Sequence, residues 1–142
     1  MEWRCILQTV DFKRIWTKPN PKHNVPTKWN WVVSYPENLQ LGKYVDIGAF
    51  TYLQAQKRIV ISDNVEIGSH CSIYSVNTID GTSGIVFIME GAQIGSHSTI
   101  LPGVTIGKNS KVGAHSLVNK NVLDNTIVVG VPAKKIGENS HV

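Results

Sequence analysis

Aliphatic residues recur at every sixth position through the second half of the sequence, most regularly between Gly91 and Val118. The repeating positions are Ile88, Ile94, Ile100, Ile106, Val112 and Val118. Glycine directly follows three of them (Gly95, Gly107 and Gly113), and a small or branched residue lies four positions after five of them (Ala92, Ser98, Val104, Ser110 and Ser116). A helix repeats every 3.6 residues and a strand every two, so a six-residue period predicts a stacked repeat.

A coil with three flat sides, each one hexapeptide long, satisfies this pattern. The aliphatic residue would point into a narrow interior, and the small residue four positions later would fill the space beside it. Eighteen residues would complete one turn, and successive turns would stack about 4.8 Å apart, the usual distance between paired strands. We expect the glycines to supply the positive φ that a sharp corner needs. The predicted fold class is therefore all-β.

Residues 41 to 136 resemble the hexapeptide-repeat acyltransferases, whose fold is a left-handed parallel β-helix. The segment Gly130-Val131-Pro132-Ala133-Lys134 also resembles the closing segment of these enzymes, in which a final strand carries G-x-P-A-K. The nearest members by resemblance are the sugar N- and O-acetyltransferases. The resemblance implies a homotrimer that uses acetyl-CoA as the co-substrate and needs no metal.

Three parts of the chain differ in their pattern. Residues 1–40 lack the repeat and are expected to form an arm or cap, residues 41–123 the β-helix, and residues 124–142 a closing segment. Within the β-helix, residues 55–58 shift the repeat by two positions, which predicts a small insertion at a corner. Nine extra residues fall near 77–84, where the sequence is polar and glycine-rich. Such an excursion from a solenoid usually marks the binding face.

The first forty residues contain all four tryptophans and four of the six prolines. The prolines between residues 19 and 26 exclude a long helix there. We expect the tryptophans to cover the open end of the β-helix or a neighbouring subunit, because a solenoid without a cap exposes apolar surface. Stacking on a base or a sugar is the alternative. Six basic residues against two acidic ones in the first 28 positions would attract phosphate.

Composition limits the remaining classes. The chain has 142 residues, a net charge of +4 and 42% hydrophobic residues, as expected of one domain. No apolar run approaches the ~20 residues of a membrane span, and the first residues lack the features of a signal peptide. Two cysteines do not form a disulfide framework, which favours a cytoplasmic location. We see no recognition helix, zinc-ligand spacing or RNA-binding signature, so nucleic acid is not an expected partner.

Aligning the turns by phase places three histidines in register. Each lies three residues after an equivalent aliphatic residue, and these histidines are His70, His97 and His115. They should form an outward-facing column, with Phe50 in the same place one turn earlier. Histidine is the natural general base near neutral pH, and acyl transfer needs a base to take the acceptor's proton. A column with only a packing role, and a zinc site of the kind that β-helical carbonic anhydrases contain, are the alternatives.

The loop at 77–84 bears on the acceptor. Maltose- and galactoside-type O-acetyltransferases carry a histidine in a segment like YTAGHP, whereas this chain reads Tyr74-Ser75-Val76-Asn77-Thr78. The segment resembles more closely the asparagine-bearing loop of N-acetyltransferases that act on nucleotide-linked amino-dideoxy sugars. That resemblance implies Asn77 as a catalytic residue beside His97 and His70. Asp80, Thr82 and His115 are then the expected sugar contacts.

The donor site also follows from the resemblance, because the family binds acetyl-CoA in the groove between adjacent β-helices of a trimer. The corner residues that would hold the pantetheine arm are Gly95, Ser96, Gly113 and Ala114. The lysines that would hold the phosphates are Lys120, Lys134 and Lys135. The expected activity is acetyl transfer to a sugar amine. The alternatives are O-acetylation of a saccharide, a zinc enzyme of carbonic anhydrase type, and an assembly module without catalysis.

Overall fold

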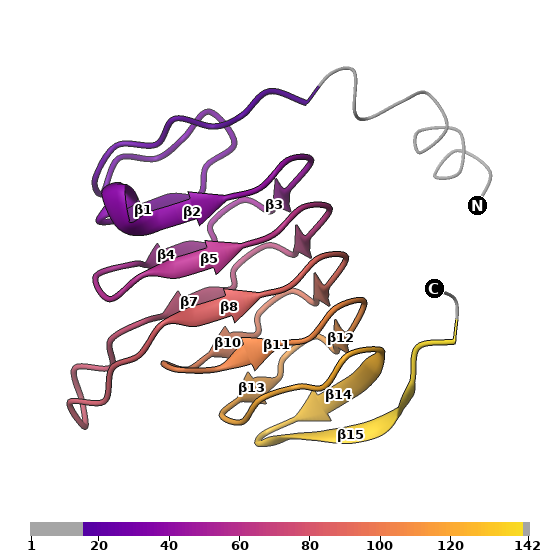
Figure 1. Ribbon diagram of the computed structural model, residues 1–142. Coiled ribbons are helices and arrows are strands. Elements are labelled where there is room, and N and C mark those ends of the chain that lie inside the picture. Colours follow the sequence, from indigo (N-terminus) through magenta and orange to yellow (C-terminus); the bar gives the residue numbers. More distant parts are fainter. Residues whose placement is uncertain (1–15, 141–142) are drawn as a thin grey trace.

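The computed structural model describes residues 16–140, which wind into a coil of three parallel sheets (Figure 1). The first sheet contains β1 (Val32–Ser34), β4 (Tyr52–Gln54), β7 (Ser72–Tyr74), β10 (Thr99–Ile100) and β13 (Leu117–Val118). The second contains β2 (Leu39–Leu41), β5 (Ile59–Ile61), β8 (Val86–Ile88) and β11 (Thr105–Ile106). The third contains β3 (Asp46–Ile47), β6 (Glu66–Ile67), β9 (Gln93–Ile94), β12 (Lys111–Val112), β14 (Thr126–Gly130) and β15 (Ala133–Glu138).

The strands stack in register from turn to turn, which confirms the three-sided coil predicted from the six-residue period. Ile67 pairs with Ile94, and Ile94 pairs with Val112, so equivalent positions of the repeat lie directly above one another. Among the strands of the described range, β14 and β15 alone pair antiparallel, as a hairpin that closes the lower end. The one helical element among residues 16–140 is a short 3-10 turn, η1 (Pro36–Asn38).

The interior is filled by one aliphatic column from each sheet. The buried residues of these columns are Leu53, Ile73, Ile100 and Val118 in the first sheet, Ile61, Ile88 and Ile106 in the second, and Ile47, Ile67, Ile94, Val112 and Val128 in the third. The small residues expected beside them are buried too, including Ala92, Ser98 and Cys71. The inward position two residues before each aliphatic one is small in the first sheet, but in the second sheet it holds Ile59 and Val86, which are also fully buried. The interior therefore accepts one aliphatic residue and one small or branched residue per side.

The glycines act differently from the expectation. None of Gly95, Gly107 and Gly113 has a positive φ. Each lies so close to the next turn that a Cβ would collide with it. An added Cβ at Gly95, for example, would lie 2.5 Å from the backbone nitrogen of Ala114. Close stacking of the turns therefore selects glycine, and other residues provide the left-handed conformation at the corners.

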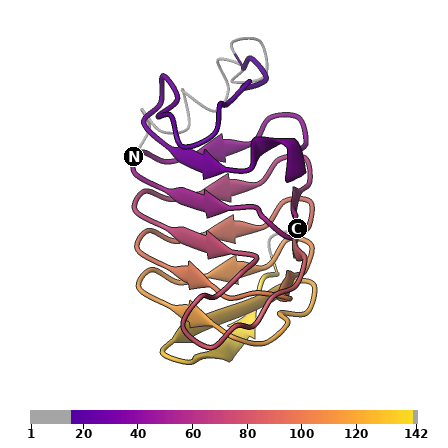
Figure 2. The ribbon, with the colours of Figure 1, turned by 90° about the vertical axis from the view of Figure 1, so that its left-hand side faces the viewer.

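The coil begins earlier than residue 41, the start expected from the repeat. β1 already pairs with β4, and β2 pairs with β5, so both strands belong to the sheets. The prolines and tryptophans of this segment hide the period from a reader of the sequence. Trp31 is 2% exposed and packs into the core at the upper end of the coil. Residues 16–31, which precede β1, lie above the first turn (Figures 1 and 2).

Two excursions interrupt the coil at the corner between the first and second sheets. Residues 55–58 form the small insertion after β4, as predicted. The longer loop between β7 and β8 projects from the body of the coil, where Figure 2 shows it crossing the lower turns. A bridge between Val76 and Ser83 gives this loop the form of a short hairpin. In the part of the chain that the structure describes, no helix is long and apolar enough to cross a membrane.

Candidate active site

His70, His97 and His115 form the predicted column at the corner that joins the third sheet to the first. The His70 and His97 rings are parallel, with centroids 4.7 Å apart and planes inclined by 6°. The His97 and His115 rings continue the stack at 4.8 Å and 4°. Phe50 extends it upward, with its ring centroid 5.1 Å from that of His70. All four side chains are exposed, so the corner presents a continuous edge of aromatic and imidazole rings.

The backbone explains why the rings stack. His70, His97 and His115 have φ values of 57°, 61° and 58°, the left-handed conformation that the corner requires. Among residues other than glycine, asparagine, aspartate and histidine enter this region most readily. The amide nitrogens of His97 and His115 donate to the carbonyl oxygens of Ser69 and Ser96 in the turn above, both at 3.0 Å. Identical backbone geometry at a fixed turn spacing therefore holds the three imidazoles parallel.

The small residues next to the histidines form the floor of the same corner. Gly95 lies against Ala114 of the next turn, and Gly68 lies against Ser96. The resemblance implies Gly95, Ser96, Gly113 and Ala114 as contacts of the pantetheine arm, and the structure does bring these four residues together beside His97 and His115. Backbone groups are accessible at such a corner because almost no side chain covers them.

The column can supply a base. The three side chains are exposed, and no hydrogen bond between residues of the 16–140 range involves a ring nitrogen of His70, His97 or His115. A neutral imidazole in this position can accept a proton from an attacking hydroxyl or amine.

The stack does not suit a single zinc ion. Zinc lies 2.0–2.1 Å from histidine nitrogens, so two nitrogens on one ion are at most about 4.2 Å apart. The nitrogen lone pairs lie in the ring planes, and rings stacked within 6° of parallel do not direct these lone pairs at a common point. Across residues 16–140 there is also no group of three or more histidine, cysteine, aspartate or glutamate residues placed to hold a metal.

The loop carrying Asn77 lies at a different corner from the histidines. Strand β7 separates His70 from this loop, so within one chain Asn77, Asp80 and Thr82 do not meet the column. Their polar groups form turns of the loop itself. The Asn77 Oδ1 accepts from the backbone nitrogen of Ile79 at 3.1 Å, and the Asp80 Oδ1 accepts from the backbone nitrogen and the hydroxyl of Thr82 at 3.0 and 2.8 Å. These two Thr82 bonds, the backbone one first, lower the pKa of the Asp80 carboxyl.

Lys120, Lys134 and Lys135 converge at the lower end of the coil. All three line one cavity of about 500 Å³ beneath the last turn, together with apolar residues such as Val118 and Val122. Lys135 forms an ion pair with Glu138, with 2.9 Å between Nζ and Oε1. The nitrogen of Gly130 in the β14–β15 hairpin donates to the hydroxyl of Ser116 at 3.1 Å, so the hairpin is attached to the histidine corner. The three lysines are therefore grouped around one cavity, which lies at the lower end of the coil, below the histidine rings.

Known proteins share both the repeat and the coil. The family model for the bacterial transferase hexapeptide (six repeats) matches residues 86–120. The chain is 31% identical over 98 residues to a serine acetyltransferase of Bacillus pumilus, an alignment that covers 66% of this chain and 45% of the relative. It is 31% identical over 118 residues to a dTDP-4-amino-4,6-dideoxy-D-glucose acyltransferase of Escherichia coli, covering 72% of this chain and 62% of that one.

A solved structure agrees. The hexapeptide-repeat acetyltransferase of Vibrio cholerae O1 biovar eltor, in complex with acetyl coenzyme A, superposes with a TM-score of 0.74 at 26% identity. The superposition covers 78% of this chain and 65% of that one. The chain belongs to the hexapeptide-repeat transferases. Its fold is thereby confirmed as the left-handed parallel β-helix, and it spans about half to two thirds of the length of the curated relatives named above.

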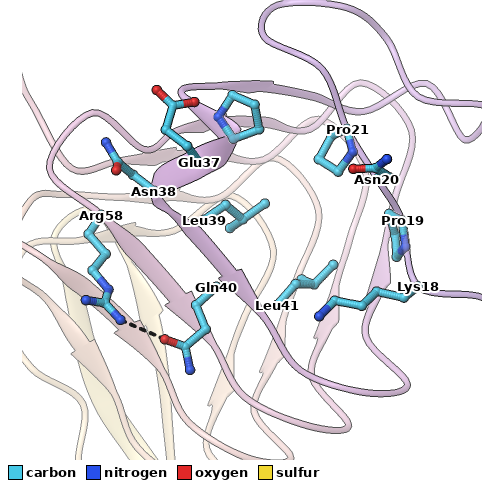
Figure 3. Close-up of a pocket in the computed structure, with 11 residues that line it drawn as sticks. Lys18, Pro19, Asn20, Pro21, Glu37, Asn38, Leu39, Gln40, Leu41 and Arg58 are labelled. Carbon is cyan, nitrogen blue, oxygen red and sulfur yellow. Dashed lines mark hydrogen bonds between the residues drawn. The ribbon is translucent and has the colours of Figure 1, made fainter.

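One cavity of this hexapeptide-repeat protein lies away from the histidines. It measures about 670 Å³ and lies between the arm at Lys18–Pro21 and strand β2 (Figure 3). Arg58 faces it and donates from Nη2 to the Gln40 Oε1 at 2.7 Å. Its only ionisable lining residues are Lys18, Glu37 and Arg58. Its lining of two cations and one exposed carboxylate differs from the histidine corner, which offers imidazoles beside exposed backbone groups.

Sequence reasoning missed one group of residues near the top of the coil. Trp16, Trp29 and Trp31 line a cavity of about 140 Å³ with Asp46, which lies on the outer face of β3. The tryptophans are easily noticed in the sequence, whereas nothing distinguishes Asp46 from other polar residues at outward positions of the repeat. Partial burial, followed by the charge of Glu66 on the next strand, raises the pKa of the Asp46 carboxyl.

Proposed function

We propose that this protein transfers an acetyl group from acetyl-CoA to a sugar, most readily to the amine of a nucleotide-linked amino-dideoxy sugar. The observation that carries the proposal is the stack of three exposed imidazoles beside a corner of glycine and small residues. The corner offers backbone groups to the donor, and the column offers a base to the acceptor. The relatives named above, a serine acetyltransferase and an amino-sugar acyltransferase, support acetyl or acyl transfer as the reaction class.

In the proposed reaction His97 acts on the acceptor, with His70 and His115 above and below it. The acceptor nitrogen or oxygen attacks the carbonyl carbon of the thioester, and the Nε2 or Nδ1 of His97 takes the proton that the acceptor loses. The carbon–sulfur bond then breaks, and the departing thiolate recovers a proton from the imidazolium. A base positioned in this way contributes about 10²- to 10⁴-fold to the rate.

Acetyl-CoA would lie along the histidine corner. Its pantetheine arm would contact Gly95, Ser96, Gly113 and Ala114, and its phosphates would lie near Lys120, Lys134 and Lys135. The grouping of these lysines around one cavity supports the second part of this placement. Dependence on acetyl-CoA and the free, buried thiol of Cys71 both suit a cytoplasmic enzyme.

We also propose that the active form is a homotrimer. Several large apolar side chains are exposed on the single chain, including Phe50 at 64%, Ile79 at 94% and Val131 at 71%. A cyclic trimer with heterologous contacts would close on itself and cover such residues. It would also allow the Asn77 loop of one subunit to approach the histidine column of its neighbour, an approach that a single chain does not permit. Asn77 would then position the acceptor amine beside His97.

Acetylation of a saccharide hydroxyl is the second candidate. The presence of a base favours it, because a hydroxyl is a poor nucleophile until its proton is removed, whereas an amine needs only to be bound neutral. The two candidates differ in what the loss of the imidazole does. Without the imidazole, the rate of transfer to a hydroxyl should fall by the whole contribution of the base, about 10²- to 10⁴-fold. The rate of transfer to an amine should fall less.

The test measures release of free CoA thiol with amino sugars and with the matching hydroxyl sugars. His97→Asn is the informative variant, because asparagine enters the left-handed region as readily as histidine but cannot serve as a base. We expect this variant to keep its melting temperature and to lose turnover. Asn77→Ala should raise KM for the amino sugar. Full activity in both variants would mean that the reaction takes place elsewhere on the molecule.

A further inference from the structure

The N-terminal arm encloses two adjoining cavities of opposite character above the first turn of the coil. One is the 140 Å³ cavity bordered by Trp16, Trp29, Trp31 and Asp46. The other measures about 430 Å³ and is lined by Lys18, Lys22 and Lys28 among proline and threonine residues. The two share Thr17, Pro19 and Trp29 as a common wall. An aromatic cavity with an acceptor thus opens beside a basic one.

The aromatic cavity has rigid walls. The Trp16 Nε1 donates to the carbonyl oxygen of Val45 at 2.8 Å, and its ring meets that of Tyr44 edge to face at 5.6 Å. Trp31 is almost completely buried and forms the floor, whereas Trp29 is 40% exposed and forms the rim. A hydrogen-bonded turn fixes the backbone that carries both rings, because the backbone nitrogens of Trp29 and Trp31 each donate to the Thr27 hydroxyl at 3.3 Å.

The size of this cavity limits its occupant to one ring. A cavity of ~150 Å³ in another protein accepts a single benzene molecule, so 140 Å³ matches one six-membered ring better than a fused pair. Capping the coil requires only a buried apolar surface, which Trp31 already provides. It does not explain why Trp29 remains exposed or why a carboxylate lies in the wall.

Asp46 indicates what the ring must carry. No residue among 16–140 donates a hydrogen bond or forms an ion pair with its carboxylate, and its neighbour in register on β6 is Glu66, another acid. Glu66 at least accepts from the Nε2 of Gln93 at 3.1 Å. An ionised carboxylate can only accept hydrogen bonds, so the fitting ring presents an N–H at its edge and a π-face to the tryptophans. A pyrimidine base has both.

The basic cavity complements such a base. Lys18, Lys22 and Lys28 are exposed, and no carboxylate of a described residue forms an ion pair with any of them. The Lys28 Nζ lies 4.5 Å from the centroid of the Trp29 ring, so the cation is held at the wall between the two cavities. Three ammonium groups beside an aromatic slot match the charge of a diphosphate joined to a base.

We propose that the arm binds a pyrimidine nucleoside diphosphate, with the base between Trp16 and Trp29 and the phosphates among Lys18, Lys22 and Lys28. This inference rests on the proposed function, because it assigns the nucleotide of the proposed nucleotide-linked sugar to the two cavities of the arm. Trp29 precedes Asn30, whose carbonyl oxygen accepts from the nitrogen of Phe50 at 2.7 Å. The two cavities therefore adjoin the upper end of the histidine corner.

The separation from the histidines suits a nucleotide-linked sugar better than a free one. Asp46 lies two turns above His97, since β3, β6 and β9 follow one another in the third sheet. Two turns correspond to roughly 10 Å along the coil, which is more than one six-membered ring. A ring in the aromatic cavity is thus a part of the acceptor distinct from the ring that reacts.

The experiment is a calorimetric titration of the 142-residue chain with dTDP, ADP and inorganic diphosphate, with tryptophan fluorescence as a second readout. Three of the four tryptophans line the cavity, so the fluorescence reports directly on its occupant. We expect dTDP to bind and to quench the fluorescence, and ADP to bind at least about tenfold more weakly because the purine exceeds the cavity. Inorganic diphosphate should bind weakly and leave the fluorescence unchanged.

Variants locate the site. Trp29→Ala should weaken dTDP at least about tenfold, which corresponds to ~1.4 kcal/mol, and Trp29→Phe should restore most of the affinity. Lys28→Ala should weaken dTDP and reduce the salt dependence of binding, whereas Lys108→Ala, an exposed lysine of another corner, should change neither. Equal affinity for dTDP and ADP, full affinity in Trp29→Ala, or quenching by diphosphate alone would each overturn the proposal.

Thermal stabilisation by acetyl-CoA, recorded on the same protein, separates this inference from the proposed function. Binding of dTDP without any response to acetyl-CoA would support the nucleotide site and contradict acetyl transfer. A response to acetyl-CoA without binding of dTDP would leave acetyl transfer standing and reject the nucleotide site.

Discussion

Replacing Gly107 by alanine should destabilise the coil without touching the candidate site. Gly107 is buried at the corner between the second and third sheets. A Cβ there would lie 2.5 Å from the backbone nitrogen of Asp124 and 2.6 Å from the carbonyl carbon of Leu123. Ordinary contact begins near 3.4 Å, so the two turns would have to separate locally by about 0.9 Å. Backbone atoms on both sides leave no flexible side chain to move aside.

The magnitude follows from what that separation disturbs. Overpacking of this kind costs about 1–3 kcal/mol. The hydrogen bonds from the Gly107 nitrogen to the Val122 oxygen and from the Lys108 nitrogen to the Asp124 Oδ1, both 2.8 Å, would lengthen, each at a cost of up to ~1.5 kcal/mol. Reduced freedom of the unfolded chain returns roughly 0.4–1 kcal/mol. The net loss is about 2–4 kcal/mol, or roughly 6–12 °C in melting temperature for a chain of this size.

The assay is thermal unfolding followed by circular dichroism at one fixed protein concentration, because association would otherwise change the midpoint. Gly137→Ala is the matched control, since Gly137 has no atom within 4 Å of an added Cβ and no positive φ. We expect that control to remain within about 0.5 kcal/mol of the unsubstituted protein. An unchanged melting temperature for Gly107→Ala, or an equal fall in both variants, would refute close stacking as the reason for glycine at these corners.

Three further predictions concern two surface carboxylates, the binding of acetyl-CoA and a buried thiol. Asp46→Asn should raise the melting temperature at neutral pH. A carboxyl with a raised pKa stabilises the fold only while it is protonated, and it loses that contribution as the pH rises. In acid, where Asp46 is protonated, the difference in melting temperature between the variant and the unsubstituted protein should vanish. The pKa of Asp80 is lowered, so its ionised form is the favoured one in the fold, and Asp80→Asn should not raise the melting temperature at neutral pH. Acetyl-CoA at 100 times its dissociation constant should stabilise the protein by ~2.7 kcal/mol in a thermal shift assay, and Lys134→Ala should require a higher concentration for the same shift. The Cys71 thiol, which is 1% exposed, should react with a thiol reagent only after unfolding; rapid reaction of the native protein at Cys71 would contradict its burial.

The sequence predicted the coil because each rung repeats the same physical demand. Positions such as Ile94 and Ser98 face a narrow interior that accepts little else, so the period is visible in a single chain. The same argument placed the histidines in register, since residues three positions after equivalent aliphatic ones must stack. The start of the coil was not visible, because Trp31 and Val33 fill the first turn without the glycines and small residues that mark later turns.

The role assigned to glycine was wrong for a different reason. Positive φ and the absence of a Cβ are both properties of glycine, and a sequence does not say which one a position uses. The structure separates them, with close stacking at Gly95 and the left-handed conformation two residues later at His97. The cavity beside Asp46 also lay beyond the sequence, because it is made by an arm whose path no period describes. The catalytic and binding roles of the candidate residues remain predictions.

The left-handed residues at the corners have a consequence for how such proteins change over time. Asn64, Asn109 and Asn125 adopt at one corner the conformation that His70, His97 and His115 adopt at another. Because the fold asks only for a residue tolerant of that conformation, an exchange of asparagine for histidine leaves the coil intact. A lineage can therefore acquire or discard an imidazole at any turn by a single substitution. Chemistry on this scaffold can move from rung to rung while the architecture stays the same.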